Sequence, residues 1–247
     1  EDLKNFIFDE DGDSVKKIGK LLDEGADPNV QNSKDKGGQT ILHRGLDLTG
    51  EGKDKIPVLD NSQCIRLIEM ISQWEEIGEK KKTTATTERK KRTKGTRKSK
   101  KGNKGSLETR DSVDRQPIHY AVERLINGHT KLDVSGRGEA VVKALLPEKI
   151  VGTGRRSSVQ RAPINVHDKE DITPLHLALK ANNIEIMTFL IEECNASPKS
   201  DKGPLLLTAV GKNNFEMIQL LLENGADPNS ITELGETIDD EYQESPL

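Results

Sequence analysis

Apolar residues recur with helical spacing in short segments spread along the chain. The clearest segments are "SVKKIGKLL" (14–22), "IEIMTFLI" (184–191) and "FEMIQLLL" (215–222), and weaker copies lie at 64–71 and 141–146. In the three clear segments and in 64–71, apolar residues fall at i, i+3, i+6 and i+7, which places them in one stripe along a helix. In 141–146 the apolar residues are Val141, Val142, Leu145 and Leu146, which also share one helix face. We therefore predict five amphipathic helices, each of which buries one face.

A second, shorter helix is predicted before each of these segments. It is clearest in "ITPLHLALKANN" (172–183), where Thr173 can cap the N-terminus and Pro174 occupies the first helical position. Variants of the same pattern lie at 39–48, 115–124 and 203–214, with a degenerate, more polar version at 2–13. The chain thus alternates a short helix with a longer, striped one.

The pentapeptide "GADPN" follows a striped helix twice, at 25–29 and 225–229. Gly25 and Gly225 can adopt the left-handed conformation that ends a helix. Asp, Pro and Asn then form a turn and prevent the helix from continuing. We interpret the pentapeptide as the end of a helix pair.

Together, "TPLHLA" (173–178) and the two "GADPN" copies, separated by helical stripes, resemble the ankyrin repeat, which has a period of about 33 residues. The resemblance covers about residues 3–77 and 111–232. It implies an all-α solenoid of about five helix-turn-helix units, with a concave face formed by hairpin tips and first helices. The expected units are roughly 3–29, 39–77, 114–147, 172–198 and 203–229.

Insertions separate these expected units. Within 78–110 the only apolar side chain longer than Ala is Leu107, so this segment cannot bury enough surface to offset its ordering entropy, and we predict disorder. Smaller excursions are expected at 49–60, 126–137 and 148–163. Residues 233–247, which end in "ESPL", are interpreted as the start of a further, truncated repeat.

The charge distribution adds a functional prediction for one segment, residues 80–105. The 247 residues carry a net charge of −4, but residues 80–105 hold thirteen Lys or Arg and one Glu, a net +12, which leaves −16 on the remainder. The basic segment has three interpretations: a solvated loop, a nuclear-import signal, or a site for RNA, DNA or another polyanion. It has no aromatic residue, so sequence-specific recognition is not expected. The import or polyanion candidates are Lys80, Lys81, Lys82, Arg89, Lys90, Lys91 and Arg92.

No catalytic set, cofactor site or metal site is expected. "DEDGD" (9–13) lacks the Gly and Glu that a calcium loop requires at its sixth and twelfth positions, and Cys64 and Cys194 are too few for a disulfide framework. The resemblance instead implies a structural role for three histidines, which would hydrogen-bond across the turn before the first helix of a unit. The structural signature comprises Thr40, His43, His119, Thr173, Pro174, His176, Gly25 and Gly225.

The resemblance implies that the protein binds another protein and is not an enzyme. Two alternatives stay open: a nuclear or polyanion-associated regulator that uses residues 80–105, and the non-catalytic arm of a larger enzyme. No run of 18 apolar residues occurs, so no membrane segment is expected, and we expect a monomer in the cytoplasm, the nucleus or both. The expected partner contacts are Gln31, Asn32, Lys34, Asp35, His167, Asp168, Lys169, Glu170, Asp201 and Lys202.

Overall fold

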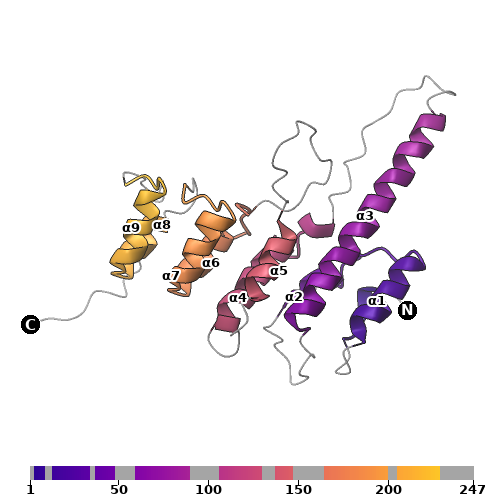
Figure 1. Ribbon diagram of the computed structural model, residues 1–247, viewed down its shortest axis with the longest axis horizontal. Helices are drawn as coiled ribbons and strands as arrows, with labels where there is room; N and C mark the ends of the chain where they lie inside the picture. Colours follow the sequence, from indigo (N-terminus) through magenta and orange to yellow (C-terminus); the bar gives the residue numbers. More distant parts are fainter. Residues whose placement is uncertain are drawn as a thin grey trace, which may run out of the picture.

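The chain folds into a row of helices, seen in a computed structural model (Figure 1). The structure describes residues 3–8, 13–33, 37–47, 59–89, 106–129, 137–146, 164–199 and 205–228, with the side chains of 76–89, 106, 129 and 137 excepted. These residues contain helices and no strand, so the predicted all-α class is confirmed for them. None of the helices in this part of the chain is long and apolar enough to cross a membrane.

The helices form two layers. One layer contains α2, α4, α6 and α8, each packed on the next, and the other contains α1, α3 and α5, with α7 packed on α9. A helix of the first layer pairs with the helix that follows it in the chain, as in α4–α5 and α8–α9. The bounds are η1 Leu3–Asn5, α1 Ser14–Asp23, α2 Ile41–Leu46, α3 Asn61–Arg89, η3 Ser106–Glu108, α4 Pro117–His129, α5 Arg137–Leu145, α6 Pro174–Lys180, α7 Ile184–Thr188, η4 Phe189–Glu193, α8 Leu205–Gly211 and α9 Phe215–Glu223.

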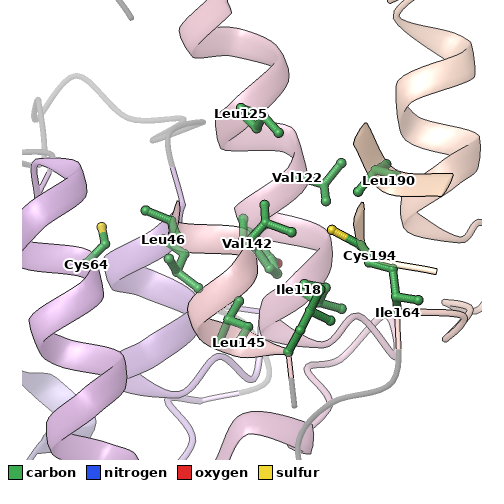
Figure 2. Close-up of a cluster of buried hydrophobic side chains, with 14 of the residues drawn as sticks. Leu46, Cys64, Ile118, Val122, Leu125, Val142, Leu145, Ile164, Leu190 and Cys194 are labelled. Carbon is green, nitrogen blue, oxygen red and sulfur yellow. The ribbon is translucent and has the colours of Figure 1, made fainter. Parts of the chain in front are cut away.

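The core lies between the two layers and runs along the row. Leu46, Ile118, Val142 and Leu145 lie in one continuous cluster with residues of the neighbouring pairs (Figure 2). Burial of such side chains stabilises each pair against its neighbours by about 25 cal/mol per Å² of apolar surface removed from water. The two cysteines are core residues in different pairs, and burial raises the pKa of each thiol to about 11.

The first short helix is not formed as predicted. Residues 3–8 contain only the 3₁₀ turn η1 and an irregular stretch, in which Phe6 and Phe8 are buried and meet edge to face at 5.6 Å. The guanidinium of Arg44 donates hydrogen bonds to the carbonyls of Leu3, Lys4 and Phe6. Because these carbonyls are satisfied by a side chain of α2, the segment can cap the row without forming a helix.

The predicted disordered insertion differs from the structure at both ends. Helix α3 continues through residues 78–89, because Lys, Glu, Arg and Ala are good helix formers and extend a helix that tertiary packing has already nucleated. On the far side, Leu107 in η3 is 1% exposed and packs into the core. Residues 90–105 lie outside the described residues.

One extra residue in the fourth pair is absorbed by a π-turn. The left-handed residues between the helices, Asn182 and Asn213, are 31 positions apart, whereas those that end the second helices, Asn195 and Gly225, are 30 apart. The additional residue lies between α7 and Cys194, where the helix widens into the π-turn η4. Such a turn inserts one residue without breaking the helix.

Candidate protein-interaction surface

Two aspartates fold the hairpin tips at one edge of the first layer. In the tip 111–115, Oδ1 of Asp111 accepts hydrogen bonds from the backbone N–H groups of Val113 and Arg115, both at 2.9 Å. The backbone N–H of Asp111 donates to the carbonyl of Arg115 at 2.9 Å and closes the loop. Asp114 adopts a positive φ of 61°, which an Asp tolerates better than most residues do.

The tip 168–172 repeats this construction atom for atom. Oδ1 of Asp168 accepts from the backbone N–H groups of Glu170 at 2.9 Å and Ile172 at 3.0 Å, and Asp171 has a φ of 59°. The common sequence signal is Asp-x-x-Asp, present as "DSVD" and "DKED". This signal was available in the sequence, but a search for helical periodicity does not detect it.

An earlier tip is closed by an asparagine. Asn32 donates its backbone N–H to the carbonyl of Gln39 at 2.9 Å and accepts the backbone N–H of Gln39 on its side-chain oxygen at 2.7 Å. This loop is longer than the other two, and Gly37 and Gly38 occupy left-handed conformations within it. Asn32 therefore takes the position that Asp111 and Asp168 have in the later tips.

Hydrogen bonds connect the three tips into what we call the tip row, residues 31–33, 37–39, 110–115 and 167–172. Backbone bonds run from Ser112 N–H to Gly37 O at 2.9 Å and from Lys169 N–H to Val113 O at 3.1 Å. The side chain of Arg110 extends the row, because its Nη1 donates to the carbonyl of His167 at 2.8 Å. Hydrogen bonds thus link the three tips to one another, although the tips come from segments far apart in the sequence.

Buried histidines attach the first helices to this row. In His43, Nδ1 accepts the backbone N–H of Thr40 at 3.3 Å, so the proton resides on Nε2, which donates to the carbonyl of Arg115 at 3.1 Å. In His119, Nδ1 accepts the N–H of Gln116 at 3.1 Å and Nε2 donates to the carbonyl of Ile172 at 3.2 Å. Each imidazole therefore joins its own helix start to the next tip.

The environment keeps these imidazoles neutral. Burial lowers the pKa of His43 to about 4, and burial shifts the pKa of His119 in the same direction. His176 repeats the local half of the arrangement, since its Nδ1 accepts the N–H of Thr173 at 3.2 Å, and Pro174 begins α6. These histidines have a structural role as hydrogen-bond bridges, and they are poorly placed to exchange protons with a substrate.

A polar network lies beneath the row. The hydroxyl of Tyr120 donates to Oδ2 of Asp111 at 2.7 Å and accepts from Nε2 of Gln39 at 3.0 Å. Burial, reinforced by the bond to Asp111, raises the pKa of Tyr120. The hydroxyl is thus held as a neutral donor.

Arg115 joins α4 to the tip 168–172 by contacting two carboxylates, Glu123 at 2.9 Å and Asp168 at 3.2 Å. Burial raises the pKa of Glu123 although Arg115 opposes the shift. For Asp168, burial acts to raise the pKa, but the backbone N–H groups of Ile172 and Glu170 together with Arg115 outweigh it and hold the pKa below its usual value. Asp168 is therefore a charged structural group at neutral pH.

The expected partner contacts divide into two kinds. Asn32 and Asp168 direct their polar atoms into the tips, whereas Lys169 and Glu170 are exposed. Gln31 is exposed but donates to the carbonyl of Arg110 at 2.5 Å. The expected contacts Lys34, Asp35, Asp201 and Lys202 lie outside the described residues, as do Lys90, Lys91 and Arg92 and the side chains of Lys80, Lys81, Lys82 and Arg89.

The glycines of the signature occur where the second helices end. Gly25 follows α1 with a φ of 97° and Gly225 follows α9 with a φ of 88°. Both donate their N–H to a helix carbonyl, Leu22 and Leu222 respectively, at 3.0 Å. A side chain would be strained at either position.

Residues 132–232 match the family model for ankyrin repeats (3 copies). The resemblance suggested by the sequence is thereby confirmed for residues 132–232, which contain ankyrin repeats. No curated protein matches the chain. Ankyrin repeats generally mediate protein–protein interactions and are typically non-catalytic.

Proposed function

We propose that this protein is a non-catalytic scaffold that binds a partner protein on the face formed by the tip row and the first helices. In this interpretation the pairs before residue 132, namely η1–α1 and α2–α3, are units of the same ankyrin type, so that five units stack. The partner would contact side chains that point away from the tips, and Asn32, Asp111 and Asp168 would hold the surface in shape.

The tip row is the observation that supports the proposal. Hydrogen bonds from Ser112, Lys169 and Arg110 fix one tip against the next, and this produces a preorganised surface that loses little entropy on binding. The exposed part is chemically mixed. Val113 is 47% exposed, Leu177 on α6 is half-buried, and Lys169 and Glu170 are exposed. Such a mixture is typical of surfaces that bind proteins reversibly.

The test compares partner capture by matched surface variants of the full chain. Val113→Asp combined with Leu177→Glu alters the proposed face, whereas Glu69→Lys combined with Glu185→Lys alters exposed positions of the second helices. Quantitative mass spectrometry after affinity capture should show partners that are lost at least about tenfold from the first variant, a change of about 1.4 kcal/mol or more. The same partners should be retained by the second variant.

Circular dichroism and thermal melting must show that both variants are folded. Equal loss of partners from both variants, or loss only from the Glu69→Lys/Glu185→Lys variant, contradicts the assignment of the face. Purified partner and protein then allow the affinity difference to be measured directly by titration calorimetry.

A second candidate function rests on α3. This helix projects well beyond its neighbours (Figure 1) and continues to Arg89, so that the first part of the basic segment lies on a helix. Lys and Arg in this segment would neutralise phosphates and release counterions. Deletion of residues 80–104 should then abolish salt-dependent binding to a 20-base-pair DNA duplex, while the Glu69→Lys/Glu185→Lys variant retains it. Unchanged DNA binding after the deletion excludes this candidate.

A further inference from the structure

Residues 3–8, which we call the N-terminal segment, have side chains that alternate between buried and exposed. Phe6 and Phe8 are 6% and 3% exposed, whereas Ile7 between them is 77% exposed. Such an alternation is typical of an extended chain, in which successive side chains point to opposite sides. Leu3 is also buried, so the segment rests on the protein through three apolar side chains.

The side chain of Arg44 on α2 holds the main chain of this segment. Its Nη1 donates to the carbonyl of Leu3 at 3.4 Å and to that of Lys4 at 3.3 Å. Its Nη2 donates to the carbonyl of Phe6. The same guanidinium lies over the Phe8 ring, 5.9 Å from the ring centroid, where a cation is attracted to the aromatic face. Arg44 therefore contacts both the backbone and an aromatic side chain of the segment.

The glycine that follows Arg44 lies where the Phe8 ring meets α3. A Cβ at Gly45 would lie 2.8 Å from Cδ2 of Leu67 and 3.3 Å from Cδ1 of Leu59. It would also lie 3.5 Å from Cζ of Phe8. Two residues after each of the other signature histidines the chain has an alanine, at 121 and 178, so α2 departs from the pattern here. We call Arg44, Gly45, Leu59 and Leu67 the aromatic seat.

Side chains attach the N-terminal segment to the helices. Within the part of the chain that the structure describes, no backbone–backbone hydrogen bond joins residues 3–8 to another element. The tips of the tip row, in contrast, are joined by backbone bonds such as that from Ser112 N–H to Gly37 O. A segment without such bonds can open locally while the helices beneath it stay folded.

We propose that the aromatic seat is a binding site for an extended aromatic-x-aromatic segment of a partner protein, and that the N-terminal segment occupies this site in cis as a competitor. In the recognition of extended peptides, main-chain bonds supply affinity and alternate side chains supply specificity. The occupant seen in the structure defines the ligand. It has two aromatic residues two positions apart, carbonyls that accept from Arg44, and a middle residue that points to solvent.

The covalent connection sets how strongly the N-terminal segment competes. Only residues 9–12 separate Phe8 from Asp13, which precedes α1. A short link of this kind gives an effective concentration in the mM range. A partner segment that makes the same contacts should therefore bind the intact chain weakly, and it should bind well once the connection is cut.

The experiment converts the N-terminal segment into a separate peptide. A protease site replaces residues 9–12 of the full chain, which is folded and then cut, and the released segment is removed by gel filtration. The probe is a fluorescein-labelled peptide of residues 3–8, measured by fluorescence anisotropy. We expect saturable binding to the cut chain that is at least about tenfold tighter than to the uncut chain. Arg44→Ala in the cut chain should weaken this binding by about tenfold or more.

Matched peptides test the specificity of the site. A peptide with Phe6→Ala and Phe8→Ala should bind at least about tenfold more weakly, because it loses both buried rings. A peptide with Ile7→Ser should change the affinity by less than about threefold, because Ile7 points to solvent. A random heptapeptide phage library should yield aromatic-x-aromatic sequences on the cut chain and none on the uncut chain.

Three outcomes overturn the proposal. The first is equal binding of all three peptides, or a library that yields no aromatic-x-aromatic sequence. The second is unfolding of the cut chain, followed by circular dichroism, when the segment is removed, because residues 3–8 would then be an indispensable part of the core. The third is dimerisation of the uncut chain that Phe6→Ala/Phe8→Ala abolishes, which would assign the seat to a second copy. None of these outcomes depends on partner binding at the tip row.

Discussion

The two junctions on either side of α6 are held together by different chemistry. Between α4 and α6 the contact includes a set of polar bonds, from His119 to Ile172 O, from Arg110 to His167 O and from Lys169 N–H to Val113 O. Between α6 and α8 the described cross-links are fewer and simpler, chiefly Asn214 to Asn182 at 3.0 Å and Lys212 to the carbonyl of Lys180 at 3.2 Å. Leu207 has replaced the histidine at the equivalent position.

The difference in bonding between the two junctions correlates with the length of the chain segment that connects the helix pairs. The bonds across the first junction join residues 53 to 57 positions apart, because long insertions intervene, and the loop-closure entropy of such connections is greater than for a short one. Across the second junction the pairs are 32 positions apart, close to one repeat period. Within the described residues, directional bonds to a tip therefore accompany the long connection, whereas helix packing and two side-chain bonds accompany the short one.

We call the hydrogen-bonded junctions α2–α4 and α4–α6 the polar junctions. The largest effect on them is expected from removing the aspartate that folds the central tip. Asp111→Ala leaves two backbone N–H groups without their acceptor and removes the partner of the Tyr120 hydroxyl. We expect a loss of about 3 kcal/mol in the free energy of unfolding, measured by urea denaturation, since hydrogen bonds to charged groups contribute about 1.5–3 kcal/mol each. Asp111→Asn should lose only about 1 kcal/mol, because Asn32 shows that an amide oxygen can close such a tip.

An equal loss for the Ala and Asn variants would contradict this account, because the cost would then not depend on the acceptor oxygen. The exposed Glu185→Ala provides the baseline. It should change the free energy of unfolding by less than about 0.5 kcal/mol.

The second largest effect is expected at the bridge between α4 and the next tip. His119→Leu introduces the residue type found at 207 and leaves the N–H of Gln116 without its acceptor. It also removes one of the two hydrogen bonds to the carbonyl of Ile172, which still accepts the N–H of Asp168. Each unsatisfied buried group costs about 1–3 kcal/mol, so we expect a loss of about 2 kcal/mol in urea denaturation. His119→Gln retains part of the donor and acceptor capacity and should lose less. If the Leu variant matches the wild type, the bridge does not contribute to stability.

Helical periodicity and the ankyrin signatures were sufficient to predict the class of fold and the pairs α6–α7 and α8–α9. They did not predict the tip row, because its bonds depend on which backbone atoms of distant segments meet. The Asp-x-x-Asp repeat at 111 and 168 hints at the tips, but a sequence pattern alone cannot show that Arg110 reaches the carbonyl of His167. The continuation of α3 to Arg89 was missed because the lack of apolar side chains was taken as evidence for disorder, although Lys, Glu and Arg favour helices without being buried.

The polar junctions should also respond to pH. The folded pKa of His43 is about 4, below the unfolded value of 6.5, and burial lowers the pKa of His119 as well. Below pH 6.5 the unfolded chain binds protons that the folded chain does not, so stability is fully present above pH 6.5 and is lost as the pH falls towards 4. His43 alone accounts for a loss of about 2 kcal/mol at pH 5.

Urea denaturation between pH 7.5 and 5 measures this loss directly. The double variant His43→Gln/His119→Gln serves as the control. It should be less stable at pH 7.5, but its stability should decline much less between pH 6.5 and 5. Asp168 does not contribute to the change in unfolding free energy between pH 7.5 and 5. Its pKa lies below the usual value near 4, so its contribution to stability is lost only at lower pH. A double variant as pH-sensitive as the wild type would assign the effect to other groups.

The smallest effect is expected from the reciprocal change, Leu207→His. In the polar junctions a histidine at this position gains stability only because a carbonyl of the next tip accepts its Nε2 proton. The described residues place no such tip beyond α8, and Leu207 is 52% exposed, so the new imidazole would remain solvated. We expect a change within about 0.5 kcal/mol in urea denaturation. A gain above 1 kcal/mol would show that the local turn, and not the bridge to a neighbouring tip, is what makes these histidines stabilising.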